Sequence, residues 1–237
     1  MPKSKTIAIM QPYFLPYIGY WQLINAVDIF VVYDDIQYTK KGWINRNRIL
    51  NNGRDSLFSL PLKKGSDYLN VCDRYMSEQF VNEKTKLLRK FEGAYIKAPY
   101  FNEGMDILTH CFTIQSDNLF DFIFHSIRYI TKTLNIKTKL IISSSMNIDS
   151  VLKGQDKVIA ICRSLNASRY INPIGGRELY NKSSFSVAGI ELFFQKVGNV
   201  QYDQGGKSFV ESLSIIDVIM FNGVNKTKAL LNEMELI

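Results

Sequence analysis

Two adjacent carboxylates, Asp34 and Asp35, directly follow the apolar run Ile29–Tyr33, which is typical of a buried strand. Open parallel sheets bind ligands beyond the carboxyl ends of their strands. Because neighbouring side chains of an extended chain point to opposite faces, we expect only one of the two, Asp34, to reach a site. There it can act as a general base, a magnesium ligand or the partner of an amine; alternatively, it caps loop amides.

A basic and aromatic segment, residues 37–48, follows the two carboxylates and interleaves four cations with aromatic rings and amides. A nucleobase can stack on such a ring while a guanidinium group binds a diphosphate through two hydrogen bonds. The alternative is an ordinary solvated loop. If the segment binds a ligand, the residues that we expect to contact it are Gln37, Lys41, Trp43, Arg46 and Asn47, with Tyr38 as a second stacking candidate.

The stretch from Ile7 to Ile24 reads as a buried strand, a proline-rich aromatic loop and a helix that opens beside Gly19. Backbone N–H groups at the start of a helix favour phosphate and other anions. We therefore expect a ligand site that begins here and includes Gln11, Pro16, Tyr17 and Gly19.

A second turn of this kind, Asn172–Tyr180, follows a later strand. Gly175 and Gly176 permit positive φ and a close approach of the backbone to a ligand. We expect Asn172 to act with Asp34 in catalysis and Tyr180 to contact the substrate.

The histidines and cysteines offer no comparable pattern. His110 and His125 lie in helical segments without a catalytic context, and Cys72, Cys111 and Cys162 are widely spaced and odd in number. This pattern predicts a reduced protein without disulfides. We expect no structural metal site, and the residues assign no cofactor.

The elements that must position these residues alternate between strands and helices. Strands Thr6–Met10 and Ile29–Tyr33 flank a helix around Gly19–Ala26, which is the parallel βαβ pattern. Further strands are expected at Ser56–Leu62, Lys139–Ser143, Arg169–Asn172 and Glu191–Gln195, with helices from near Gln155, Ser183 and Ser214. The pattern predicts a single α/β domain, 1–237, with a Rossmann-like, mostly parallel sheet and a mainly helical insertion at about 77–134.

Composition limits the class of protein. With 46% hydrophobic and 22% charged residues, the 237-residue chain is typical of a globular protein. Its net charge of +7 implies an acidic partner. Because the cations are dispersed, we expect no nucleic acid. Without an apolar run of membrane-spanning length or a signal peptide, we expect a cytoplasmic protein.

Five segments together resemble the WbqC-like family of bacterial polysaccharide gene clusters. They are MQPYFLPYIGYWQLI, YDDIQYTKKGWINRNRIL, LPLKKGS, YINPIGGRELY and LSIIDVIMFNG, spanning residues 10–223. The resemblance implies acylation or aminoacylation of a nucleotide-linked amino sugar in O-antigen biosynthesis. It places in the site Gln11, Pro16, Gly19, Asp34, Gln37, Lys41, Arg46, Asn47, Asn172, Gly175, Gly176, Tyr180 and Asp217.

The resemblance thus implies transfer of an acyl or aminoacyl group to the amine of a dTDP- or UDP-linked sugar, and we expect Asp34 to handle the amine. The donor would be a thioester of coenzyme A or of an acidic acyl carrier protein. One alternative is a non-catalytic binding module for nucleotide sugars. Another is an enzyme like the nucleotidylyltransferases, whose opening strand, loop and helix look similar. Those enzymes carry histidines where this chain has Pro16 or Tyr17 and Tyr20.

Overall fold

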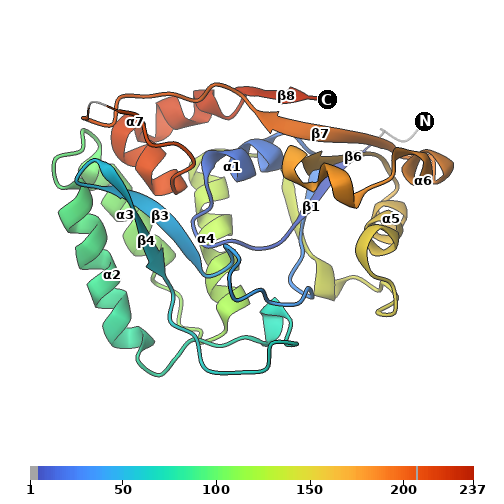
Figure 1. Ribbon diagram of the computed structural model, residues 1–237, viewed down its shortest axis with the longest axis horizontal. Coiled ribbons are helices and arrows are strands. Elements are labelled where there is room, and N and C mark those ends of the chain that lie inside the picture. Colours follow the sequence, from blue (N-terminus) through green and yellow to red (C-terminus); the bar gives the residue numbers. More distant parts are fainter. Residues whose placement is uncertain (1–4, 207) are drawn as a thin grey trace.

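A six-stranded sheet forms the centre of the computed structural model, which describes residues 5–206 and 208–237 (Figure 1). The spatial order is β5-β2-β1-β6-β7-β8, and every neighbouring pair is parallel except β7 with β8. The expected Rossmann-like, mostly parallel sheet is therefore confirmed. Its strands are β1 (Lys5–Met10), β2 (Ile29–Val32), β5 (Lys139–Ile142), β6 (Ala167–Pro173), β7 (Glu191–Val197) and β8 (Met234–Leu236).

Helices cover both faces of the sheet because its side chains alternate between two apolar clusters. Ile7 and Ile9 of β1 pack with residues of α5 (Gly154–Ser164) and α6 (Lys182–Val187). Ala8, between them, belongs to the larger cluster on the opposite face. The helices that contribute to that larger cluster are α1 (Ile18–Asn25), α2 (Phe80–Tyr95), α3 (Phe101–Cys111), α4 (Leu119–Thr133) and α7 (Ile215–Leu230).

Three of these helices, α2, α3 and α4, lie within the predicted helical segment 77–134. Asn118 caps α4, its side chain accepting a hydrogen bond from the Asp121 amide at 3.1 Å. We retain a single domain with a helical insertion as a proposal. In the described part of the chain, every helix is too short or too polar to cross a membrane.

A separate antiparallel hairpin joins β3 (Arg46–Asn51) to β4 (Arg54–Ser59). The sequence analysis placed one strand here, at Ser56–Leu62, and read residues 37–48 as a loop. The hairpin begins inside that loop because Asn52 and Gly53 adopt positive φ values of 50° and 74°. An Asn-Gly turn of this kind matches the twist of two paired strands.

Candidate functional site

The strand order reverses between β1 and β6. In chain order the parallel strands are arranged 3-2-1-4-5, so β1 pairs with β2 on one side and with β6 on the other. Sheets of this type bind ligands at such a reversal, outside the carboxyl ends of the strands. Gln11 directly follows β1, and Asn172 lies near the end of β6. These two expected site residues therefore flank the point where a ligand is most favoured.

Asp34 follows β2 at this same edge, but its carboxylate is occupied by the protein. Its Oδ1 accepts hydrogen bonds from the Ser144 amide and the Ser143 hydroxyl, both at 2.9 Å, and its Oδ2 accepts from the Ser144 hydroxyl at 2.6 Å. The residue is 1% exposed. Asp34 therefore holds the 3-10 turn Ser143–Ser145 that follows β5, which is the loop-capping alternative weighed for it above.

Asp35 is the carboxylate of the pair that reaches solvent, with a side chain 26% exposed. Its Oδ2 lies 2.6 Å from the Nζ of Lys157 on α5, and its Oδ1 accepts a hydrogen bond from Ser143. The Lys157 side chain is only 8% exposed. Because the buried Lys157 holds it, the partly exposed Asp35 carboxylate has a fixed orientation.

Tyr33 completes this group, because the Lys157 ammonium lies 5.0 Å from the centre of its ring. Burial raises the pKa of Tyr33; Lys157 opposes that shift and the charge of Asp35 reinforces it. Burial also lowers the pKa of Lys157, but hydrogen bonds and charges from Asp35 and Tyr33 outweigh it, so that pKa is raised. At neutral pH the site thus holds an ammonium and a protonated phenol beside a carboxylate. We call Tyr33, Asp35, Ser143 and Lys157 the Asp35 cluster.

A second polar group lies on β6 and after it. The Tyr170 hydroxyl donates to Asn172 Oδ1 at 3.0 Å and lies 3.4 Å from the Tyr180 hydroxyl. Tyr33, Tyr170 and Tyr180 pack in the same apolar cluster on one face of the sheet. Asn172 and Tyr180 therefore lie on the same face of the sheet edge as the Asp35 cluster.

The two glycines after Asn172 differ in what they permit. A Cβ at Gly176 would lie 2.2 Å from Asn172 Nδ2, whereas a Cβ at Gly175 would meet nothing within 4 Å. Neither has positive φ, and both lie inside the 3-10 turn Ile174–Leu179, so the expectation of special backbone angles was wrong. Of the two positions, only 176 requires glycine, because a Cβ there would clash with the Asn172 side chain.

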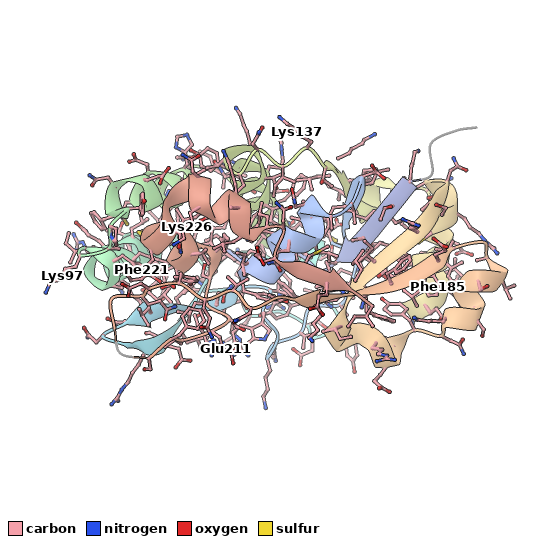
Figure 2. All side chains as sticks on the ribbon, turned by 90° about the horizontal axis from the view of Figure 1, so that it is seen from above. Lys97, Lys137, Phe185, Glu211, Phe221 and Lys226 are labelled. Atoms are coloured by element: carbon pink, nitrogen blue, oxygen red, sulfur yellow. The ribbon has the colours of Figure 1, made fainter. Side chains whose placement is uncertain are left out.

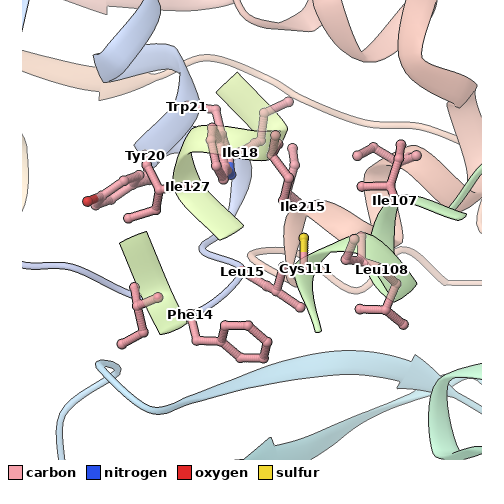
Figure 3. Close-up of a cluster of buried hydrophobic side chains, with 14 of the residues drawn as sticks. Phe14, Leu15, Ile18, Tyr20, Trp21, Ile107, Leu108, Cys111, Ile127 and Ile215 are labelled. Carbon is pink, nitrogen blue, oxygen red and sulfur yellow. The ribbon is translucent and has the colours of Figure 1, made fainter. Parts of the chain in front are cut away.

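The loop between β1 and α1 has buried apolar side chains, carbonyls held by hydrogen bonds, and a rim of polar side chains. Phe14 and Leu15 are fully buried among Trp21, Ile127 and Ile215 (Figure 3). Leu15 has a φ of 48°, and its carbonyl accepts from Asn47 Nδ2 at 2.7 Å and from Ser214 Oγ at 2.8 Å. The Pro16 carbonyl accepts from the Ile215 amide and the Trp21 indole. Asn47 and Pro16 therefore shape the loop rather than face a ligand.

The rim of this loop consists of half-buried Gln11, Tyr13 and Tyr17. The Tyr13 hydroxyl donates to Gln11 Oε1 at 3.2 Å. Tyr17 lies at the start of α1, which has no side-chain cap, and Gly19 lets this helix lie against Tyr17 and Val197, since a Cβ there would approach them to 2.5 and 2.6 Å. These residues connect the strand reversal to the neighbouring pocket.

A pocket of about 250 Å³ opens beside Tyr17, at the carboxyl end of β7. Its lining combines two further aromatic rings with amides, hydroxyls and one carboxylate. Flat rings edged by hydrogen-bonding groups suit a nucleobase or a sugar. The residues that line it include Asn199, Gln201, Tyr202, Phe209, Glu211 and Ser212. We call this the β7 pocket.

Two residues predicted to bind a ligand, Trp43 and Arg46, lie together at the surface. Trp43 is 44% exposed, and the guanidinium groups of Arg46 and Arg48 lie 5.5 and 5.7 Å from its ring centre. Arg46 also donates to the carbonyls of Gly42 and Lys41. Arg48 donates to the carbonyl of Ser212, a residue of the β7 pocket, at 3.4 Å. This surface therefore borders that pocket.

Three other residues of the basic segment are placed differently. Tyr38 is buried under the Arg74 guanidinium, which lies 4.7 Å from its ring centre, so its faces are not free for stacking. Gln37 is exposed and donates to the Asp67 carbonyl at 2.8 Å. The Lys41 side chain is exposed on the loop.

Asp217 is fully buried in α7 and saturated by protein donors. It accepts hydrogen bonds from Tyr95 at 2.8 Å, Tyr202 at 2.7 Å and Gln204 at 3.0 Å. Burial raises its pKa, and these three hydrogen bonds oppose the shift. The network leaves Asp217 no free lone pair facing solvent, so it supports the wall of the β7 pocket through Tyr202.

Sequence reasoning missed Lys157, Tyr33 and the role of Ser143 in this site. Lys157 lies 122 positions from Asp35, and nothing in its local sequence marks it as a partner. The serine run after β5 could bind phosphate or cap the next segment by its sequence alone, and no local pattern links it to Asp35.

A comparison with family models identifies one family. A family model described as the WbqC-like protein family matches residues 11–229. The chain is 28% identical over 221 residues to "Uncharacterized protein Rv1507c" of Mycobacterium tuberculosis, a match that covers 92% of this chain and 94% of the relative. No solved structure matches the chain significantly.

Proposed function

The chain belongs to the WbqC-like protein family, and from this premise we propose that it transfers an acyl or aminoacyl group to the amine of a nucleotide-linked amino sugar. The observation that carries the proposal is the Asp35–Lys157 ion pair at the carboxyl edge of the sheet, beside the strand reversal. It presents a fixed carboxylate where sheets of this kind hold the reacting end of a ligand.

The proposed step joins the sugar nitrogen to the carbonyl carbon of a thioester. The C–N bond forms as the C–S bond breaks; Asp35 takes the proton that the nitrogen releases and passes it to the sulfur, which leaves as a thiol. Lys157 keeps the carboxylate oriented, and the protonated Tyr33 phenol can donate a hydrogen bond to the carbonyl oxygen as it becomes negative. No protein nucleophile is needed, because the thioester is already activated.

The nucleotide extends from this point towards the β7 pocket. We propose that the base occupies the pocket beside Tyr17 and Tyr202, bordered by Trp43 and Arg46, while the diphosphate crosses Gln11 and Asn172. From β2 to β7 is three strand spacings, about 14 Å, which an extended nucleotide sugar can bridge. The three cysteines are free, which fits the reducing cytoplasm in which we place the reaction.

The direct test incubates the purified chain with a dTDP- or UDP-linked amino sugar and an acyl-coenzyme A or acyl-carrier thioester. Mass spectrometry would detect a sugar heavier by one acyl group. The matched control is the same nucleotide sugar with a hydroxyl in place of the amine, which should stay unmodified. Tight binding of the amino sugar without product from any donor would support a binding module instead.

A further inference from the structure

A second and larger concavity lies at the opposite edge of the sheet from the β7 pocket. It is a groove of about 1040 Å³ between α4 and β5, the strand at one edge of the sheet. Figure 2 shows Lys137, which lines the groove, and Glu211, which lines the β7 pocket, on opposite sides of the molecule. The groove is therefore separate from the β7 pocket.

The charge of the groove is one-sided. Its lining contains the exposed side chains of Arg128, Lys132, Lys137 and Lys139 together with His125, and no aspartate or glutamate. Within residues 5–206 and 208–237, none of the four exposed cations forms an ion pair. Unpaired cations that line one depression favour a partner with a negative surface.

Apolar side chains separate these cations. The floor is formed by half-buried residues, which are Phe124, Tyr129, Leu140 and Ile142. Apolar floors bordered by charges are typical of protein interfaces, whereas nucleic-acid interfaces are more polar. This lining therefore favours an acidic protein over nucleic acid.

The kind of partner element follows from β5 itself. The strand has only four residues, and Lys139 lies on it; short edge strands and lysines both discourage pairing with another strand. An amphipathic helix uses side chains rather than backbone groups and fits a groove with an apolar floor. The expected occupant is therefore an acidic helix of a folded partner.

The groove ends next to the Asp35 cluster. Ser145 lines it and belongs to the 3-10 turn Ser143–Ser145, whose first residue contacts Asp34 and Asp35. We propose that this groove docks an acidic carrier protein, so that the thioester on its flexible arm reaches Asp35. Naming the partner as the acyl carrier rests on the proposed function; docking of an acidic protein is tested apart from it.

The experiment measures binding of fluorescently labelled holo-acyl carrier protein to the full chain by anisotropy. Arg128→Glu combined with Lys132→Glu, two exposed groove positions on α4, should raise Kd by about tenfold or more, because each reversal places like charges together. Lys137→Glu with Lys139→Glu should act in the same direction, which guards against a local defect in α4.

The matched control is Arg89→Glu with Lys226→Glu, which changes the net charge equally at exposed helical positions outside the groove. This control should change Kd by less than about twofold, since charges far from an interface are screened. The docking proposal is overturned if the unaltered chain does not bind the carrier, if control and groove variants weaken binding equally, or if a single-stranded DNA oligonucleotide binds the groove and the carrier does not.

Turnover separates this inference from the proposed function. The groove variants should lower kcat/KM for the carrier-bound donor and leave it unchanged for the coenzyme A thioester. Carrier binding without acylation by any donor would remove the transferase and keep the docking surface. Acylation from coenzyme A without carrier binding would keep the transferase and remove the docking surface.

Discussion

The Lys157 ammonium lies 2.6 Å from the Asp35 carboxylate and fastens α5 to the chain that leaves β2. Since Lys157 is buried and the Asp35 side chain is 26% exposed, the pair holds a partly accessible carboxylate in a fixed orientation. Asp34, its neighbour, is enclosed by Ser143 and Ser144. Two adjacent aspartates thus have different environments and, in this account, different tasks.

Asp34→Ala should lower stability rather than chemistry. It removes the acceptor shared by the Ser144 amide, the Ser144 hydroxyl and the buried Ser143 hydroxyl, which should reduce the free energy of unfolding by about 1–3 kcal/mol. Asp149→Ala is the matched control: Asp149 also accepts one amide, from Val151, but is exposed, so the change should stay within about 0.5 kcal/mol. Urea denaturation measures both, and a normal unfolding curve with collapsed turnover would return Asp34 to the chemistry.

Gly176→Ala should disturb Asn172, whereas Gly175→Ala should not. The new methyl group at 176 would lie 2.2 Å from the Asn172 amide, while the one at 175 enters open space. We expect the first variant to weaken nucleotide-sugar binding by about tenfold, the effect of losing one good hydrogen bond, and the second to bind normally. Calorimetry decides; equal affinities would place Asn172 outside the site.

The contribution of the Asp35–Lys157 pair to stability should be lost at alkaline pH. The folded pKa of Lys157 is raised above its ordinary 10.5, so its contribution is complete below that pH and is lost as pH rises through the folded pKa. Lys157→Met should therefore cost stability at pH 8 and progressively less above about pH 10.5. Lys196→Met removes an exposed cation 3.8 Å from Glu235 and should cost little at any pH. A cost for Lys157→Met that does not change with pH would contradict the pairing.

The cysteines should be dispensable for transfer. Burial, with smaller contributions from nearby carboxylates, raises the pKa of Cys72 to about 11; burial also raises that of Cys162 to about 12 and that of Cys111. Thiols of this kind are protonated at neutral pH and poor nucleophiles. Cys72→Ser should keep kcat with a coenzyme A thioester, and trapping of an acyl group on Cys72 by mass spectrometry would contradict direct transfer.

The strands β1 and β2 were predictable because they are largely continuous apolar runs, and β1, β2 and β5 lie within one residue of the expected ranges, whereas the short antiparallel strand β8 was not predicted. The hairpin was mispredicted because the Asn52-Gly53 turn was overlooked, although the sequence carries it. The position of Gln11 and Asn172 beside the strand reversal was also predictable from the sequence, since Gln11 follows one expected strand and Asn172 ends another.

The Asp35 cluster was not predictable in the same way. Alternation requires Asp34 and Asp35 to differ in direction, but which of them faces solvent depends on the turn after β5, more than 100 residues later. Lys157 comes from a helix whose sequence shows only an amphipathic pattern. Such contacts arise from packing of distant segments, and a single sequence contains no periodic signal for them.

The most direct test of the account compares Asp35→Asn with the unaltered chain in acylation of a dTDP- or UDP-linked amino sugar by a coenzyme A thioester. Asparagine keeps the shape of the side chain but cannot take a proton. We predict unchanged binding of the nucleotide sugar by calorimetry and a kcat lower by about 10²–10⁴-fold, the usual contribution of a general base. Acylation by Asp35→Asn at the rate of the unaltered chain would contradict the central claim that Asp35 accepts the proton of the sugar amine.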